Sequence, residues 1–357
     1  MIRYIIRRLL QAIPTFFGIT IISYALMSAS GNPVRVLSFR PDSSVEEQER
    51  LANVLGVNDP WVIQYLRWLL GDDWMRWDTG EDGVADRAVL LPLDADGDGE
   101  NEPPGERLGV VRGDFGNSFV KKRPVLDLIF ERMPATLELS VSSLVIGTII
   151  GLIIGIAAAV NRGKAIDNAS RVIAVVFDAI PGFWLSLLLL LIFGSQLKLL
   201  PIGDRCKLTL DDSCPPIYER LEYMVLPVFV FATGVISGYS RLMRASMLDV
   251  LGQDYIRTAL SKGLSNRMML YRHAARNAMI PIATFLGPAI TGLLGGAVVI
   301  ETIFNYPGVG RTLFEAATSR DYPVVMAAVI YGALATILGY LISDILYAWI
   351  DPRIRFT

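Results

Sequence analysis

Carboxylates at alternate positions form the clearest candidate for metal chemistry in this sequence. The segment contains Asp94, Asp96, Asp98, Glu100 and Glu102. Acids at positions 1, 3 and 5 with a glycine at position 6 match the start of a calcium-binding loop, in which alternate side chains surround a hard cation. Position 12 is a glycine, and the next acid comes one place late. The pattern therefore predicts either a calcium site that stiffens the segment or a solvated acidic loop.

The two cysteines, Cys206 and Cys214, are separated by seven residues. If this segment faces an oxidising compartment, a disulfide between them is expected. Two free thiols are the alternative.

Catalytic residues are sparse. The single histidine, His273, has no nucleophile nearby and no H-E-x-x-H motif, which argues against a membrane enzyme such as an intramembrane protease. His273 is therefore interpreted as a surface or docking residue. The sequence also has no G-x-x-x-x-G-K-[ST] phosphate loop, so any ATP chemistry must belong to a partner. We expect that the chain is not an enzyme.

The elements that position these residues are membrane spans. Hydrophobic residues make up 52% of the 357 residues and charged residues 19%. A helix needs roughly 20 mostly apolar residues to cross about 30 Å of hydrocarbon. Six stretches meet this requirement, and they are 9–27, 139–160, 173–197, 224–239, 280–300 and 324–350.

The charges are sorted between the segments that connect these spans. Basic residues dominate the N-terminus, the loop after the second span, residues 241–276 and the C-terminus, whereas acids outnumber bases in the other connections. The positive-inside rule then places both termini in the cytoplasm. The first span could instead be a signal peptide, because Ser28-Ala29-Ser30 resembles a cleavage site. Its apolar run is longer than a signal peptide requires.

Two acids fall inside the predicted spans, Asp178 in the third and Asp344 in the sixth. Charges are costly in a bilayer, so each is expected to face protein or water. With Pro181, which would kink the third helix, they are candidates for a polar pathway or an interhelical lock. For Asp178, a position near the headgroups beside a neighbouring arginine such as Arg171 is the alternative.

The extracytoplasmic segment 29–137 is too long for a simple connection. Residues 45–55 are expected to form a helix that begins after Ser43 or Ser44. A second helix is expected over 61–70, where Pro60 suits the first turn. Residues 71–112 are acidic and rich in glycine and proline, as in an inserted loop.

The cytoplasmic segment 241–276 predicts a helix that begins at Asp254 and is stopped by Gly263. Ser265 then caps a second helix, which runs to about residue 277. Two short amphipathic helices between membrane spans form a knob suited to docking in the groove of a partner. A helix pair that lies on anionic lipid is the alternative.

Here the sequence resembles the permease subunits of bacterial ABC importers, whose cytoplasmic signature is E-A-A, three residues, then glycine. Arg257-Thr258-Ala259 and Gly263 occupy these places, with arginine replacing the glutamate. Further strings resemble the B-type subunit of dipeptide and oligopeptide permeases over nearly the whole chain outside 71–112. Among them are Gly113-Asp-Phe-Gly116, Arg132-Met-Pro-Ala-Thr-Leu-Glu-Leu139, Pro181-Gly-Phe-Trp184, Glu301-Thr-Ile-Phe-Asn-Tyr-Pro-Gly-Val-Gly-Arg311, Arg320-Asp-Tyr-Pro323 and Asp351-Pro-Arg353.

The resemblance implies an all-α membrane protein with six transmembrane helices and the fold of a type I ABC importer permease. Its expected divisions are the N-terminus with the first helix (1–28), the extracytoplasmic segment (29–137) and a five-helix permease core (138–357). It implies a bacterial inner-membrane location and an importer of di- or oligopeptides that works by alternating access. Nickel complexes or sugars are alternative substrates, and a self-sufficient secondary transporter or channel is the alternative class.

The expected partners are a second homologous permease, two cytoplasmic ATPases that carry ATP and magnesium, an external substrate-binding protein and the lipid bilayer. No nucleic acid is expected. The residues expected to dock the ATPases are Asp254, Tyr255, Arg257, Thr258, Ala259, Lys262, Gly263 and Leu264.

Overall fold

The structure is a computed structural model that describes residues 2–29, 61–71, 76–77, 87–88, 108–207, 214–283 and 298–350, with residues 285, 289 and 292. For residues 2–9, 76–77, 87–88 and 343–350 only the backbone is described. Three predictions lie wholly or mostly outside the described residues, and they are the helix over 45–55, the acidic loop over 94–102 and the fifth span over 280–300.

The described chain is mostly helical, as predicted. Four helices are long and apolar enough to cross a membrane, and they contain the predicted first, second, fourth and sixth spans. These helices are α1 (Ile2–Ala29), α5 (Val125–Val160), α8 (Leu221–Leu251) and α15 (Tyr322–Ile350).

The predicted third span is a bent pair of helices and not one continuous helix. Helix α6 (Ala165–Ala179) meets α7 (Gly182–Leu189) at 95°, and the π-helical segment η3 (Leu190–Gln196) follows. The bend lies at Ile180, which has the extended backbone expected before a proline. Helix α6 also begins earlier than hydropathy indicated, because Asp167 in its polar first turns binds Arg244 of α8.

The chain divides into two compact units, unit 1 (1–12, 132–312 and 332–357) and unit 2 (13–131 and 313–331). In unit 2, helix α4 (Trp61–Leu70) has the predicted bounds and packs on α1. The hydroxyls of Thr20 and Tyr65 share a 3.0 Å hydrogen bond, and the Tyr24 ring lies 5.6 Å from the Tyr65 ring. The short helix η2 (Val110–Arg112) is tied to α4 because Arg112 donates to the carbonyl oxygen of Leu70.

Two further features of unit 2 were not predicted. Strand β1 (Arg76–Trp77) pairs in antiparallel fashion with β2 (Arg87–Ala88), so the insert contains a two-stranded sheet. The Asp321 carboxylate is buried and accepts hydrogen bonds from the Ser118 hydroxyl and the Phe119 amide. This carboxylate ties the loop before α5 to the start of α15.

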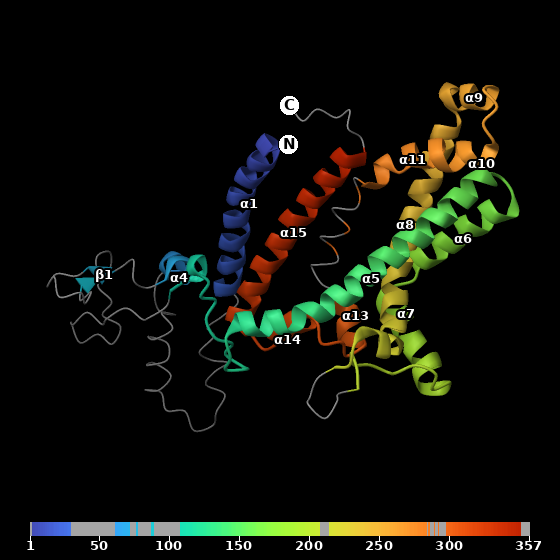
Figure 1. Cartoon of the computed structure of the whole chain (residues 1–357). Coiled ribbons are helices and arrows are strands. Elements are labelled where there is room, and N and C mark those ends of the chain that lie inside the picture. Colours follow the sequence, from blue (N-terminus) through green and yellow to red (C-terminus); the bar gives the residue numbers. More distant parts are fainter. Residues whose placement is uncertain are drawn as a thin grey trace. The chain divides into compact units, whose positions relative to one another are not determined.

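In unit 1, short helices lie at the two ends of α8 (Figure 1). The elements that follow α8, at what we call the α9 end, are α9 (Asp254–Ser261), α10 (Asn266–Met268), η5 (Met269–Ala274) and α11 (Ala275–Ala278). The opposite end, which we call the disulfide end, contains η4 (Ile217–Glu219) and α13 (Val298–Ile303). Helix α14 (Val309–Thr318) begins shortly after α13.

A row of glycines brings α5 and α8 into close contact. Gly147, Gly151 and Gly155 are one turn apart on α5, and a Cβ at each would lie within 3.2 Å of a backbone carbonyl oxygen of α8. Lipid tails provide no hydrophobic force between membrane helices, so close backbone packing of small residues is a main source of their association. We call this contact the glycine seam.

Candidate functional site

The predicted docking knob forms at the α9 end. Helix α9 ends in a Schellman motif, in which the amide of Gly263 donates to Leu260 and the amide of Leu264 donates to Ala259. Gly263 has a φ of +83°, which glycine adopts without a steric penalty. Ser265 caps the next helix by accepting a hydrogen bond from the Met268 amide. The local sequence therefore sets the turn between the two helices of the knob.

One apolar side chain anchors the knob to α8. Ile256 is 2% exposed and packs in a cluster with Met243 and Met247 of α8 and Met269 of η5. The Asn277 amide also donates to the Tyr255 hydroxyl, which joins α9 to α11. Packed side chains therefore join α9 to α8, and a hydrogen bond joins α9 to α11.

The predicted docking residues lie on the outside of this knob. Ala259 and Leu264 are partly buried, and the exposed residues are Asp254, Tyr255, Arg257, Thr258, Lys262 and Gly263. The sequence did not indicate that Ile256 and Asn277 hold them in place. An apolar residue inside a charged helix was the available signal for Ile256.

Two aspartates of α6 bind two arginines of α8. Asp167 is buried and accepts two hydrogen bonds from Arg244, at 2.5 and 2.9 Å, and one from the Gly163 amide. Asp178 pairs with Arg241 at 2.9 Å, and both side chains are about half exposed. Arg171 contacts Asp167 instead, so the sequence misidentified the arginine beside Asp178. The two pairs connect α6 to α8, and the role predicted for Asp178 stays a prediction.

The other pathway candidates have no shared site in the described structure. Pro181 is exposed and lies at the start of α7, just after the bend. Asp344 belongs to α15, and its side chain lies outside the described residues. Their roles in a pathway stay predictions.

A buried carboxylate organises the segment between α13 and α14. Glu301 is fully buried, and its carboxylate accepts hydrogen bonds from the Thr136 hydroxyl and the Arg311 amide, both at 2.8 Å. The Thr136 hydroxyl in turn accepts a hydrogen bond from the Val309 amide. Burial raises the pKa of Glu301, although these donors and the Gly310 amide oppose the rise. Thr136 and Glu301 thus satisfy the free amides at the start of α14.

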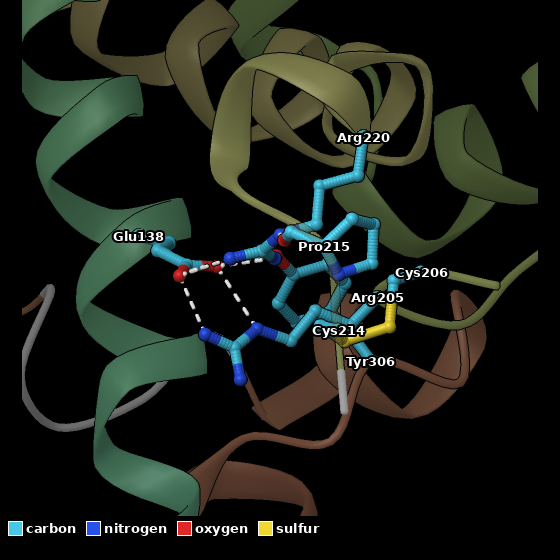
Figure 2. A network of polar contacts seen from close by, with 7 residues as sticks. All are labelled: Glu138, Arg205, Cys206, Cys214, Pro215, Arg220 and Tyr306. Atoms are coloured by element: carbon cyan, nitrogen blue, oxygen red, sulfur yellow. Dashed lines mark hydrogen bonds and ion pairs between the residues drawn. A yellow bond between two sulfur atoms is a disulfide. The ribbon is translucent and has the colours of Figure 1, made fainter. Parts of the chain in front are cut away.

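A second carboxylate, Glu138 of α5, binds two arginines at the disulfide end (Figure 2). Arg205 donates to it at 3.0 and 2.5 Å, and Arg220 donates at 2.9 and 2.6 Å. The Tyr306 hydroxyl donates from 3.2 Å. Burial raises the pKa of Tyr306, and its hydrogen bonds to Glu138 raise the pKa of Arg220, so both remain protonated donors. We call these four residues the Glu138 clamp.

The structure joins Cys206 and Cys214 in a disulfide next to this clamp (Figure 2). The sequence singled out the cysteines but gave no role to Glu138, Arg205 or Arg220. The available signal was an acid at the edge of an apolar span, with one arginine directly before the first cysteine and another shortly after the second.

A family model and several curated relatives identify the same family. Residues 151–356 match the family described as binding-protein-dependent transport system inner membrane component. The oligopeptide transport system permease protein AppB of Bacillus subtilis is 36% identical over 100% of both chains. The dipeptide transport system permease protein DppB of Escherichia coli K12 is 34% identical over 99% of both. The glutathione transport system permease protein GsiC of the same strain is 33% identical over 100% of both.

The matched range covers more than half of the chain and includes α6, α8, the docking knob and Glu301. The similarity to the named relatives extends from one end of the chain to the other. Together with the long apolar helices, these matches indicate a multi-pass membrane protein. The chain therefore belongs to the family of binding-protein-dependent transport system inner membrane components.

Proposed function

We propose that this chain is a permease subunit of an ATP-driven importer of di- or oligopeptides. The observation that carries this proposal is its similarity over the full chain to relatives named for oligopeptide, dipeptide and glutathione transport. With a second homologous permease it forms the translocation pathway, and an external binding protein delivers the peptide. A self-sufficient secondary transporter would not need the exposed docking knob.

The two ends of α8 support the orientation that we propose. At 1.5 Å per residue, this helix of 31 residues is about 46 Å long, which exceeds the roughly 30 Å of bilayer hydrocarbon. Disulfides persist in oxidising compartments. In this proposal the disulfide end faces outward and the α9 end faces the cytoplasm of a bacterial cell. The sorting of charge along the sequence supports cytoplasmic termini by the positive-inside rule. Residues 29–137 are then extracytoplasmic, and 138–357 form the permease core.

Two cytoplasmic ATPases dock on the knob in this proposal. ATP and magnesium bind to those partners, because this sequence has no phosphate loop. Closure of the ATPases moves α9, and the packing of Ile256 passes the movement to α8. Switching of the pathway between inward and outward access is then a two-state change biased by a local contact.

The decisive experiment uses the complete complex in nanodiscs. ATP hydrolysis is measured with the binding protein and a panel of dipeptides, tripeptides, glutathione, nickel complexes and sugars. We expect peptides to stimulate hydrolysis, and only when the binding protein is present. Stimulation by nickel complexes or sugars alone would replace the substrate class, and transport by the permease without ATPases would overturn the proposed function.

Variants of the knob test the coupling step. Gly263→Pro forces φ to about −65° at a residue that needs +83°, and Lys262→Glu reverses an exposed charge. Each is expected to lower peptide transport at least ~10-fold, which corresponds to about 1.4 kcal/mol of coupling. The amount of permease in the membrane should stay unchanged. Lys198→Glu, an exposed charge reversal at the disulfide end, is the matched control. Wild-type transport in both knob variants would rule out this docking surface.

We also propose that the insert binds calcium through Asp94, Asp96, Asp98, Glu100 and Glu102. Carboxylates are hard oxygen ligands suited to this cation. Limited proteolysis of the purified permease, with calcium and with chelator, checks the proposal by mass spectrometry. Calcium is expected to slow cleavage within 71–112 and to leave other cleavage sites unaffected. Equal digestion under both conditions would leave only the solvated acidic loop.

A further inference from the structure

The Glu138 clamp connects segments that are distant in the sequence. Glu138 lies on α5, Arg220 directly precedes α8, and Arg205 and Tyr306 come from the connections around them. Both arginines bind the same carboxylate through two nitrogens, which is the most directional form of a charge-assisted hydrogen bond. The Glu138 side chain is 17% exposed and that of Arg220 is 6% exposed, so water competes little for these bonds. The clamp therefore holds α5, at Glu138, to the start of α8.

The disulfide lies close to a backbone carbonyl that orients the Arg220 side chain. The Nε atom of Arg220 donates to the carbonyl oxygen of Pro215 at 3.0 Å, and Pro215 directly follows Cys214. The bond to Cys206 brings the two cysteine Cα atoms to 5.7 Å. It thereby attaches Pro215 to the segment that contains Arg205. One edge of the Arg220 guanidinium is oriented by this carbonyl, and its two terminal nitrogens bind Glu138 (Figure 2).

Arg205 has a second support that does not involve the disulfide. The Asp204 amide donates to the Phe304 carbonyl oxygen at 3.0 Å, and a Cβ at Gly203 would lie 2.8 Å from the same oxygen. Asn305 also donates to the Asp204 carboxylate. Residues 203–205 are therefore fixed against the segment after α13. Among the described residues, the hydrogen bond from Arg220 is the one that the Pro215 carbonyl oxygen accepts.

We propose that the Cys206–Cys214 disulfide positions Arg220 on Glu138 and so joins α5, at Glu138, to the start of α8. Arg220 and Glu138 are positioning residues, and the disulfide acts through Pro215. The consequence for peptide import rests on the proposed function, whereas the clamp can be measured on the permease alone. The arginines that bind Glu138 belong to the same chain.

Labelling of arginines by phenylglyoxal tests this arrangement. The purified permease in nanodiscs is treated with the reagent before and after reduction by a water-soluble phosphine, and each arginine is quantified by mass spectrometry. Reduction transfers two electrons from the phosphine to the disulfide and leaves two thiols. We expect the labelling rate of Arg220 to rise at least ~10-fold, because local opening governs the reaction of a protected group. Arg205 is expected to change less.

Two arginines of the same chain serve as references. Arg244 is paired with buried Asp167, away from the disulfide, and its labelling should not respond to reduction. Arg162 is exposed and should be labelled quickly in both states. An unchanged rate at Arg220 after complete reduction would overturn the proposal. A parallel rise at Arg244 would also overturn it, because the disulfide would then support the whole fold and not the clamp.

Two variants distinguish positioning of Arg220 by the clamp from simple shielding of Arg220 by the loop between Cys206 and Cys214. The double variant C206A/C214A should give the labelling pattern of the reduced protein without any reductant. Glu138→Gln keeps the disulfide but removes the charge, and it should also increase labelling of Arg220. If Arg220 stays protected in Glu138→Gln, the loop alone shields it and the positioning role is wrong. In the complete complex, C206A/C214A should lower peptide transport more than basal ATP hydrolysis, a split that general misfolding would not produce.

Discussion

Glu301→Ala is expected to lower the unfolding temperature of the permease strongly. The substitution removes the acceptor for the Thr136 hydroxyl and the Arg311 amide in a fully buried site. Each buried donor left without an acceptor costs about 1–3 kcal/mol. The sum, roughly 4 kcal/mol, is a large part of the ~5–15 kcal/mol that stabilises a typical domain. Thermal unfolding of the detergent-solubilised permease measures the loss.

Glu301→Gln separates shape from charge at the same site. Its amide oxygen can replace one acceptor, so a smaller loss of about 1–2 kcal/mol is expected. Gly308→Ala should resemble Glu301→Ala, because the added Cβ would lie 2.3–2.4 Å from three atoms of the Glu301 carboxylate. Glu222→Ala, at an exposed position, is the control. If Glu301→Ala unfolds at the temperature of this control, the buried carboxylate does not support the start of α14.

Local signals in the sequence predicted local structure well. Helix α4 begins directly after Pro60, and the docking knob turns at Gly263 and Ser265 as expected. In each case the deciding residue acts on its own backbone or on the adjacent turn, through a fixed φ, a left-handed glycine or a capping hydroxyl. The prediction needed no knowledge of the partners in space.

Contacts between distant residues were not predictable in the same way. The partner of Asp178 is 63 residues away on α8, and Glu138 binds arginines 67 and 82 residues away. Hydropathy also placed the start of the third span too late, because Asp167 and Arg171 look unsuitable for a buried helix. In the folded chain, Arg244 satisfies Asp167, so α6 continues through these polar turns.

A side chain in the glycine seam is expected to impair transport strongly. A Cβ at Gly155 would lie 2.7 Å from both the Met243 Cβ and the Ser240 carbonyl oxygen, so any side chain forces α5 and α8 apart. Met243 belongs to the cluster that holds Ile256 of the docking knob. Gly155→Leu should therefore reduce ATP-coupled peptide transport at least ~10-fold, the equivalent of about 1.4 kcal/mol. Uptake in proteoliposomes, normalised to assembled complex, checks this result.

Two matched glycine-to-alanine variants are expected to change the stability of the permease in opposite directions. Gly238 lies on α8, and a Cβ added there would have no atom of the described residues within 4 Å, so Gly238→Ala should stabilise the helix by up to ~1 kcal/mol through propensity alone. Gly155→Ala gains the same propensity but should still destabilise, because its methyl group has no space. Equal stabilisation in both variants would contradict close packing at the seam.

An exchange of one methyl group across the seam tests whether the contact itself matters. A Cβ at Gly147 would lie 2.7 and 2.9 Å from two side-chain atoms of Val235, and its next neighbour is the Ala232 carbonyl oxygen at 3.2 Å. Gly147→Ala alone should therefore impair transport, and Val235→Gly in the same chain should restore part of it by removing both clashing atoms. Val235→Gly by itself weakens α8 and cannot improve transport through helix propensity. Restoration in the double variant would consequently show that the distance between α5 and α8 is the property on which transport depends, whereas additive loss would show that each helix acts alone.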